Sequence, residues 1–401
     1  MRILFVSPAA PHPPRIGSAV ITLNQIRVLS ARHTIDLISF KDRAESSDLG
    51  ELPCWCNKIL LVTRPARWRV VLSMVSRVFV DPLREISRAR CSEMSRVVAE
   101  RLAGGYYDIA LFQTIQAAQF RPDSYSGPTV WSLEDPPALK TEKMLSMFPW
   151  YCRPLYRQRI RQLRRYDERH AKKFGCVTFV NREDAKDYMN AVPGASADFV
   201  PHGVDQESAY SPNFNRRKGM IVMTGNMYHP PNVDAVEFFC RDIFPLICQR
   251  DPSANLWLVG ANPVATVRKW ARDPRIKVTG FVPGVRTYLR EAMVSVCPVR
   301  LRIGAQTKIL EALACGTPVV TTSAGNYGIG AVAGQHLYVA DDPREFADRV
   351  VSLLSAEEWN ELSQNGQRFV RDNFSWENSS AKLEQIVERL MNGKRTNLSS
   401  A

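Results

Sequence analysis

The chain has 401 residues, of which 45% are hydrophobic and 23% are charged, an ordinary balance for a globular protein. Its formal net charge of +13 indicates an anionic partner. The longest apolar run, residues 70–80, contains Arg77 and is too short to span a membrane, and the apolar start ends at Pro8, so we expect neither a membrane span nor a secretory signal.

The first half of the chain alternates short apolar strands with helices. A helix whose first turn Ser18 can cap follows the first strand, and its apolar face includes Leu23 and Ile26. This alternation predicts a parallel sheet covered by helices on both faces. The predicted strands are residues 3–6, 35–38, 59–62, 109–112, 130–133 and 177–180.

A second alternation follows a linker formed by residues 201–205 and the polar stretch 213–218. Its predicted strands are residues 221–223, 256–259, 276–279, 294–297, 319–322 and 337–339, and its predicted helices are 232–249 and 343–354. The tail predicts helices over 356–370 and 376–391, with frayed residues after Asn392.

We therefore predict an α/β protein with two Rossmann-like, doubly wound domains facing across a cleft. The first is 1–205 and the second is 206–375. Residues 376–401 form a closing helix that packs back toward the first domain.

Nine cysteines are scattered along the chain, and none of them completes a zinc-binding spacing with a second Cys or His pair. We expect reduced thiols in a cytoplasmic protein and no metal site.

The most informative stretch is residues 308–320, KILEALACGTPVV, which reads as a short helix, a stop at Gly316 and a buried strand. The small residues Gly304 and Ala305 precede it and let a ligand approach the backbone. Lys308 adds a full positive charge to the helix N-terminus, which attracts phosphate. Glu311, one turn later, can accept hydrogen bonds from sugar hydroxyls. An ordinary helix-to-strand unit of an α/β sheet remains the alternative.

Other charged residues follow the ends of predicted strands. Arg300 and Arg302 are candidates for bidentate contact with a diphosphate, with a solvated loop as the alternative. Glu134 and Asp135 follow a strand of the first half and are candidates to orient or deprotonate an acceptor hydroxyl. The alternative for Asp135 is a helix N-cap before Pro136.

Two arginine-rich stretches, 64–101 and 153–173, contain apolar or aromatic side chains at intervals. Such helices can lie on an anionic membrane, and a solvated helix face is the alternative. No motif matches a nucleic-acid-binding module, so we expect no nucleic-acid partner.

The sequence resembles the retaining glycosyltransferases of the GT-B fold, the group 1 or family 4-like enzymes that use nucleoside-diphosphate sugars. The resemblance covers nearly the whole chain. It is carried by RILFVSP at 2–8 followed by Gly17-Ser18, PHGVD at 201–205, the 308–320 stretch and FSW at 374–376. It implies that the first domain binds the acceptor and the second binds the donor. The donor-binding residues it implies are Gly17, Gly225, Asn226, Phe281, Val282 and Ile309, with Phe281 and Val282 at the nucleobase.

Two departures from the family pattern stand out. Asn226 occupies the position of the usual arginine, and Pro231-Asn232 stands near that of the usual lysine. The family motif contains two acidic residues separated by seven others. Glu311 matches the second of them, whereas Ile303 stands at the position of the first. Because of the first departure, Lys308, Arg300 and Arg302 would have to neutralise the diphosphate. Because of the second, the sequence does not indicate which sugar the donor carries.

We therefore predict a metal-independent, cofactor-free hexosyltransferase that moves a sugar to a hydroxyl of a glycan, a lipid-linked saccharide or a small molecule, with retention and in polysaccharide biosynthesis. It would be cytoplasmic, with peripheral association with the inner face of the membrane as an open possibility. A nucleotide-sugar epimerase and a non-catalytic nucleotide-sugar-binding or scaffold protein are the alternatives.

Overall fold

The computed structural model describes residues 1–8, 11–12, 17–41, 49–64, 86–87, 89–205, 216–355 and 359–398, with side chains up to Asn392 in the last helix. The chain divides into two compact units. Unit 1 comprises Met1–Pro201 together with Trp376–Ala401, and unit 2 comprises His202–Ser375. Val204 and Asp205 belong to unit 2, where the Val204 N–H donates to the Phe374 carbonyl.

Unit 1 is built on a parallel seven-stranded sheet with the order β3-β2-β1-β4-β5-β6-β7. The order reverses between β1 and β4, which is where doubly wound sheets bind ligands at the carboxyl ends of their strands. The strands are β1 (Arg2–Ser7), β2 (Thr34–Lys41), β3 (Lys58–Thr63), β4 (Ile109–Gln113), β5 (Thr129–Ser132), β6 (Cys176–Phe179) and β7 (Ala197–Phe199).

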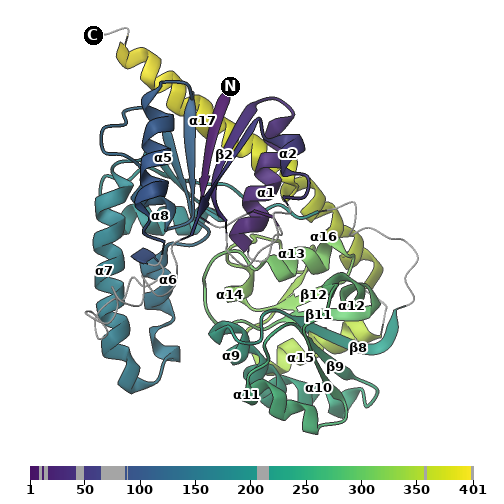
Figure 1. The fold of residues 1–401 in the computed structure, drawn as a ribbon. Coiled ribbons are helices and arrows are strands. Elements are labelled where there is room, and N and C mark those ends of the chain that lie inside the picture. Colours follow the sequence, from purple (N-terminus) through teal and green to yellow (C-terminus); the bar gives the residue numbers. More distant parts are fainter. Residues whose placement is uncertain are drawn as a thin grey trace. The chain divides into compact units, whose positions relative to one another are not determined.

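Helices cover both faces of this sheet (Figure 1). Because side chains alternate along a strand, Ile3 and Phe5 of β1 enter one core, with α1 and α17, whereas Leu4 and Val6 enter the other, with α5, α7 and α8. The helices are α1 (Gly17–Ser30), α2 (Leu52–Trp55), α5 (Ser92–Ala103), α6 (Pro137–Lys143), α7 (Arg153–Ala171), α8 (Arg182–Ala191) and α17 (Trp376–Leu398), with short 3-10 turns at Ala117–Phe120, Leu145–Met147 and Trp150–Cys152.

The C-terminal helix α17 is part of unit 1. Leu383, Ile386 and Val387 are buried beside α1 and the sheet. The Glu384 carboxylate lies 2.7 Å from His33 Nε2 and 2.9 Å from an Arg32 guanidinium nitrogen. The last segment of the chain therefore completes the core that the first segment begins.

Unit 2 is a second parallel sheet, with the order β10-β9-β8-β11-β12-β13 and one contiguous core. Its strands are β8 (Arg217–Thr224), β9 (Asn255–Val259), β10 (Ile276–Gly280), β11 (Ala292–Cys297), β12 (Val319–Thr321) and β13 (Tyr338–Val339). Its helices are α9 (Pro230–Phe238), a π-helical turn (Phe239–Ile243), α10 (Phe244–Arg250), α11 (Ala265–Arg268), a 3-10 turn (Lys269–Arg272), α12 (Val285–Glu291), α13 (Thr307–Ala314), α14 (Ser323–Asn326), α15 (Pro343–Leu354) and α16 (Trp359–Asn373).

All twelve strands expected from the sequence are present, and both units are Rossmann-like. Four local predictions need correction. Strand β7 was not expected, because Ala-Asp-Phe carries no β-branched residue. The single helix expected over 232–249 contains a π-helical turn before Pro245, which has no N–H to continue the α-helical ladder.

The other two corrections concern the expected linker and tail. Residues 206–215 lie outside the described residues, but β8 already begins at Arg217. The Arg216 guanidinium donates to the carbonyls of Ala292 and Gly316, which fixes this residue on unit 2 instead of in a linker. The last helix does not fray at Asn392, since its backbone remains helical to Leu398.

Asp167 of α7 is an ionisable residue in the core of unit 1. Its side chain is 1% exposed, and its Oδ1 has no hydrogen-bond partner. Burial, with a smaller contribution from Glu168, raises the pKa of Asp167 to about 8. The folded state therefore holds a proton that the unfolded chain releases above about pH 4, so Asp167 costs stability increasingly as pH rises from about 4 to about 8.

We predict that Asp167→Asn raises the Tm of the protein more at pH 8 than at pH 5, because Asn cannot ionise. The expected gain at pH 8 is about 1–3 kcal/mol, measured by thermal unfolding across that pH range. Glu388→Gln at an exposed position of α17 is the control and should change stability by less than about 0.5 kcal/mol at either pH. An equal effect of Asp167→Asn at both pH values would contradict this account of its ionisation.

Candidate functional site

The candidate site of unit 2 lies where its strand order reverses. Strands β8 and β11 are neighbours in the sheet although they are not consecutive in the chain. The end of β8 leads into Gly225 and Asn226, and the end of β11 leads through residues 298–306 into α13. Ligands bind at this position in doubly wound sheets, beside helix N-termini.

Two glycines allow the loops after β8 and β9 to approach each other closely. Gly225 and Gly260 both have φ of +150°, which L side chains rarely adopt. A Cβ on Gly260 would lie 1.8 Å from the Gly225 carbonyl oxygen, and a Cβ on Gly225 would lie 2.8 Å from Asn232 Nδ2. The backbone of the β8 loop is therefore held against Asn232 with no room for a side chain.

A chain of hydrogen bonds joins this loop to α13. Lys308 Nζ donates to Asn232 Oδ1 at 2.5 Å, although the two residues are 76 positions apart in sequence. Asn232 Nδ2 in turn donates to the Asn226 carbonyl at 2.9 Å. The lysine is thus held by a neutral amide, which fixes its position without cancelling its charge.

The helices that carry these residues begin at the same place. Gln306 at the N-cap of α13 and His229 at the N-cap of α9 form no side-chain cap hydrogen bond. Helix N-termini carry unpaired N–H groups and a partial positive charge. Pro230 and Pro231 occupy the first two positions of α9 and have no N–H, and the N–H groups of Asn232 and Val233 donate to the His229 carbonyl, so the first turn of α9 offers no free N–H to a ligand. The Lys308 ammonium and the N-terminal dipole of α13 are therefore the groups that favour an anion such as a diphosphate.

Glu311 lies one turn after Lys308. Burial raises the pKa of its carboxyl, and the charges of Arg286 and Lys308 act in the opposite direction. Arg286 also contacts Asp205, at 3.3 Å. Ile309 is 1% exposed and belongs to the core, and its N–H donates to the Gln306 carbonyl at 2.8 Å, so neither its side chain nor its N–H faces a ligand in this structure.

The loop before α13 is closely packed. Gly304 has φ of +57°, and a Cβ on Gly328 would lie 2.2 Å from the Gly304 carbonyl oxygen. Ala305 packs against the core, and the Ile303 carbonyl accepts from the Gln306 side chain. The small residues noted in the sequence are therefore needed for packing of this loop, whatever their role toward a ligand.

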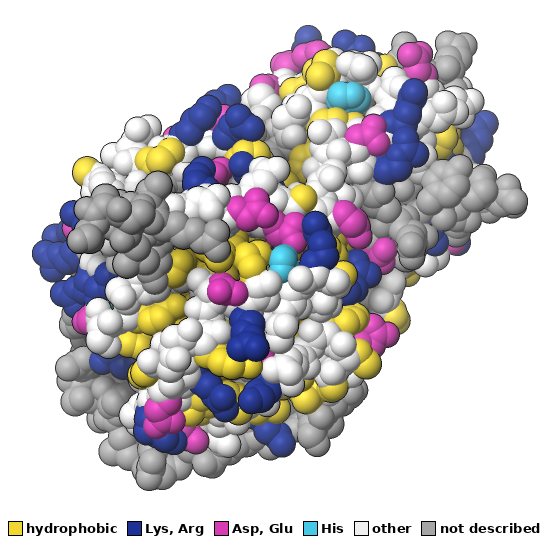
Figure 2. Space-filling model, turned by 90° about the horizontal axis from the view of Figure 1, so that it is seen from above, with side chains coloured by type: hydrophobic (Ala, Val, Ile, Leu, Met, Phe, Trp, Pro, Cys, Tyr) yellow, Lys and Arg dark blue, Asp and Glu magenta, His cyan; other side chains and the backbone are white. Residues whose placement is uncertain are grey.

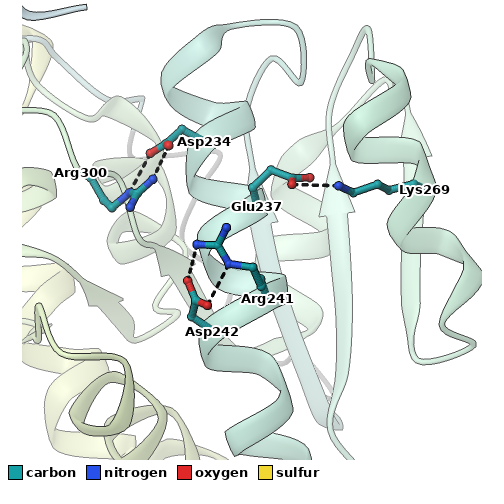
Figure 3. Close-up of polar contacts among 6 residues, drawn as sticks. All are labelled: Asp234, Glu237, Arg241, Asp242, Lys269 and Arg300. Atoms are coloured by element: carbon teal, nitrogen blue, oxygen red, sulfur yellow. Dashed lines mark hydrogen bonds and ion pairs between the residues drawn. The ribbon is translucent and has the colours of Figure 1, made fainter. Parts of the chain in front are cut away.

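Arg300 is engaged with a carboxylate in the structure. Its guanidinium forms a bidentate ion pair with Asp234 of α9, and the pKa of Arg300 is raised by this hydrogen bonding (Figure 3). The pair cancels most of the charge that the sequence offered for phosphate binding. Contact with a diphosphate would require Arg300 to exchange Asp234 for phosphate, so Lys308 is the better-placed cation. Arg302 is exposed.

Phe281 and Val282 follow β10. Gly280 turns the chain with φ of +71°, Val282 packs against the core, and the Phe281 side chain is 78% exposed. An exposed ring on a fixed turn is available for stacking, and the predicted nucleobase contact stays a prediction.

In unit 1, Glu134 rather than Asp135 lies against Gly17 and Ser18 at the start of α1. A Cβ on Gly17 would lie 3.2 Å from Glu134 Oε1, and the Ser18 hydroxyl hydrogen-bonds to Glu134. Helix α1 starts at Gly17, so Ser18 lies within its first turn and does not cap it. Asp135 pairs with Lys140 at 2.6 Å, and the N-cap of α6 is Pro136, so Asp135 does not cap that helix.

Burial and the neighbouring Asp135 raise the pKa of Glu134, whereas Lys140 and the Ser18 hydrogen bond oppose the shift. A carboxyl group with a raised pKa is suited to proton transfer. The structure thus distinguishes two adjacent acids that the sequence left equivalent.

Among the residues that the structure describes, no group of three or more His, Cys, Asp or Glu side chains has a metal-binding arrangement. All nine cysteines are free thiols. No described helix has both the length and the apolarity of a membrane span, and residues 70–80 lie outside the described part of the chain.

Comparison with known proteins identifies the second unit. Residues 218–356 match the family described as Glycosyl transferases group 1. Unit 2 belongs to this family. The matched residues include the Gly225 loop, Asn232 and Lys308, so the cluster described above lies within the family domain.

Two relatives extend the similarity. An uncharacterised 44.6 kDa protein in the cps region of Klebsiella pneumoniae is 20% identical over 93% of this chain and 96% of its own length. A GDP-mannose-dependent alpha-(1-6)-phosphatidylinositol monomannoside mannosyltransferase of Mycolicibacterium smegmatis is 26% identical over 53% of this chain and 61% of its own.

Solved structures show the fold of the whole chain. Sucrose-phosphate synthase from Thermosynechococcus elongatus matches with a TM-score of 0.71 at 15% identity, covering 98% of this chain and 100% of that one. HepE of Anabaena, in complex with UDP-glucose, matches with a TM-score of 0.64 at 15% identity and the same coverage. The group 1 glycosyltransferase domain is therefore one of two Rossmann-like domains of a GT-B fold.

We predict that Gly225→Ala disrupts nucleotide binding, because its Cβ would meet Asn232 and the required φ is strained for alanine. The expected cost is about 1–3 kcal/mol in stability, together with loss of the thermal protection given by nucleoside diphosphates. Gly284→Ala is the matched control, since φ there is −142° and its Cβ would meet only Thr287 Oγ1 at 3.8 Å. If both variants retain equal protection, the β8 loop is not part of the site.

Proposed function

We propose that this glycosyltransferase moves a sugar from a nucleoside-diphosphate sugar to a hydroxyl acceptor, with Lys308 stabilising the diphosphate that leaves. The observation that carries the proposal is the hydrogen-bonded chain from Lys308 through Asn232 to the Asn226 carbonyl, at the strand-order reversal of unit 2. Negative charge develops on the leaving diphosphate in sugar transfer, and a fixed cation stabilises it.

The charges of their hydrogen-bond partners favour Lys308 over Arg300 as the cation that binds the diphosphate. Asn232 is neutral, so the Lys308 ammonium keeps a full charge for an incoming phosphate. Asp234 is anionic, so Arg300 is neutralised before any ligand arrives. The N-terminus of α13 adds the partial positive charge of its helix dipole, whereas α9 begins with Pro230 and Pro231 and has no N–H to donate there. Together these groups support neutralisation by the protein alone, and metal independence is part of the proposal.

The donor base and sugar are proposed only as a class. One similar structure holds UDP-glucose, and one relative is named as GDP-mannose-dependent. Ile303, at the position where the family carries its first acid, offers no carboxylate to the sugar. Glu311 is therefore proposed to bind ribose or sugar hydroxyls, with Phe281 and Val282 at the base.

On the acceptor side, we propose that Glu134 orients or deprotonates the acceptor hydroxyl, supported by its contact with Gly17 and Ser18. The relatives from a cps region and from phosphatidylinositol mannoside synthesis favour a glycan or lipid-linked acceptor in polysaccharide or glycolipid assembly. Retention of anomeric configuration is proposed from the family resemblance. A non-catalytic nucleotide-sugar-binding protein is the competing function, and Ile303 is the residue that favours it.

We predict that Lys308→Ala lowers nucleoside-diphosphate release from the accepted donor by about 10²–10³-fold. The assay is donor hydrolysis across a panel of UDP-, GDP-, ADP- and dTDP-sugars, with and without EDTA. Lys269→Ala, which removes an exposed lysine of the same unit that pairs with Glu237, is the control and should retain full activity. Turnover unaffected by Lys308→Ala would refute the assignment, and loss of turnover in EDTA would refute metal independence.

We predict a rise in hydrolysis rate with pH that disappears in Glu134→Gln. Glu134 acts as a base only when deprotonated, and its raised pKa moves this rise above pH 4.5. In donor hydrolysis a water molecule takes the place of the acceptor hydroxyl. The measurement is therefore the hydrolysis rate as a function of pH for the wild-type protein and for Glu134→Gln. Asp135→Asn is the neighbouring comparison and should lower the pH of the rise, because Asp135 contributes to the raised pKa of Glu134. An unchanged profile in Glu134→Gln would exclude this residue as the base.

A further inference from the structure

Three exposed apolar side chains lie together in unit 1, at the turn between α6 and α7. Among the described residues, eight large hydrophobic side chains are exposed, and three of them fall within six positions of sequence. They are Trp150, Tyr151 and Leu155, with exposed fractions of 78%, 68% and 53%. We call residues 144–157 the hairpin tip.

The hairpin tip is held in shape by its own contacts. The rings of Phe148 and Tyr156 stack with their centroids 3.7 Å apart, and the Arg153 guanidinium donates to the carbonyls of Phe148 and Ser146. The rings of Trp150 and Tyr151 meet edge to face at 6.0 Å. These contacts present Trp150 and Tyr151 outward from an ordered turn.

The hairpin tip projects from the core of unit 1. Helix α7 has no buried residue before Ile160, although Leu163, Asp167 and Ala171 later in the helix are buried. Figure 1 shows α6 and α7 side by side, extending beyond the strands with the tip at their far end. The tip can therefore contact a flat surface without unfolding the helix.

The charge around the hairpin tip is predominantly basic, although one of its arginines, Arg164, pairs with Glu142 of α6. Residues 144–166 contain six arginines and neither Asp nor Glu. Arg157, Arg161 and Arg165 recur every four residues, so they share one side of α7, and all three are exposed. In contrast, the face seen in Figure 2 shows Lys and Arg interspersed with Asp and Glu, which makes no continuous basic surface.

We propose that the hairpin tip is a docking surface for an anionic lipid bilayer. Trp150, Tyr151 and Leu155 enter the boundary between headgroups and acyl chains, where amphipathic aromatic rings are stable. Arg157, Arg161 and Arg165 pair with lipid phosphates. A bilayer fits better than a nucleic acid, because an apolar tip at the end of a hairpin gains by leaving water, whereas the described chain shows no nucleic-acid-binding motif. The proposal does not depend on sugar transfer.

The test is binding of the full chain to sedimented vesicles of phosphatidylcholine, with and without phosphatidylglycerol. We expect binding to the anionic vesicles alone, weakened by salt. The triple variant Trp150→Ser, Tyr151→Ser, Leu155→Ser should lose this binding at least tenfold, and so should Arg157→Gln, Arg161→Gln, Arg165→Gln. Arg27→Gln, Arg96→Gln, Arg182→Gln removes three exposed arginines from other helices of unit 1 and should bind within about twofold of wild type.

A second readout keeps the test independent of folding. Brominated lipid should quench part of the tryptophan fluorescence, and that part should vanish in Trp150→Phe, a substitution at an exposed position. The proposal is overturned if the wild-type chain ignores anionic vesicles, if both triple variants bind as the control does, or if Trp150→Phe leaves quenching unchanged. It is also overturned if the tip variants lose binding to a single-stranded oligonucleotide while the wild type binds no vesicles.

Discussion

The candidate site of unit 2 depends on one contact, the hydrogen bond from Lys308 to the Asn232 side chain. It joins two helices whose N-termini lie at the strand-order reversal of unit 2, and it fixes a cation without neutralising it. A carboxylate in place of Asn232 would orient the lysine equally well but would cancel the charge that a diphosphate needs. Arg300 shows this cancellation, because it pairs with Asp234, two residues further along α9.

The close approach of the glycine loops makes this contact possible. Gly260 lies against the Gly225 carbonyl, and Gly225 lies against Asn232, so the β9 loop, the β8 loop and α9 are stacked in order. A side chain at either glycine would separate them. Unit 1 has a comparable arrangement, in which Gly17 leaves room for the Glu134 carboxylate. In both units small residues after a strand admit a charged side chain from a neighbouring element.

Strand positions could be predicted from the sequence because buried parallel strands are runs of β-branched and aromatic residues with polar ends. That signal was absent for β7, whose residues are Ala-Asp-Phe, and the π-helical turn before Pro245 interrupts a helix without changing its apolar pattern. The end of α13 before Gly316 could be predicted because the cause is local: Gly adopts the left-handed conformation that ends a helix, and Pro cannot continue one. Gly316 has φ of +68°, as that role requires.

The candidate site was harder to predict from the sequence than the strands, because its contacts join residues that are far apart in sequence. Lys308 was visible from its place at a helix start, but its partner lies 76 residues away. Asn232 was noticed as a departure from the family pattern, and its role became clear only from its two hydrogen bonds. Arg300 was selected for its position after a strand, and nothing nearby in sequence indicated Asp234. Glu134 and Asp135 were equivalent until the structure placed Lys140 on one and Ser18 on the other.

The most direct measurement is calorimetric titration of UDP and GDP into the wild-type protein and Asn232→Asp. The substitution keeps the lysine contact and makes the partner anionic. It also removes the hydrogen bond that Asn232 Nδ2 donates to the Asn226 carbonyl, and the effect of that loss does not depend on salt, so the salt dependence isolates the effect of charge. If Lys308 holds the diphosphate with its free charge, Asn232→Asp weakens the tighter nucleotide by about tenfold or more, and the loss shrinks at high salt. Equal affinities for the two proteins would contradict the account.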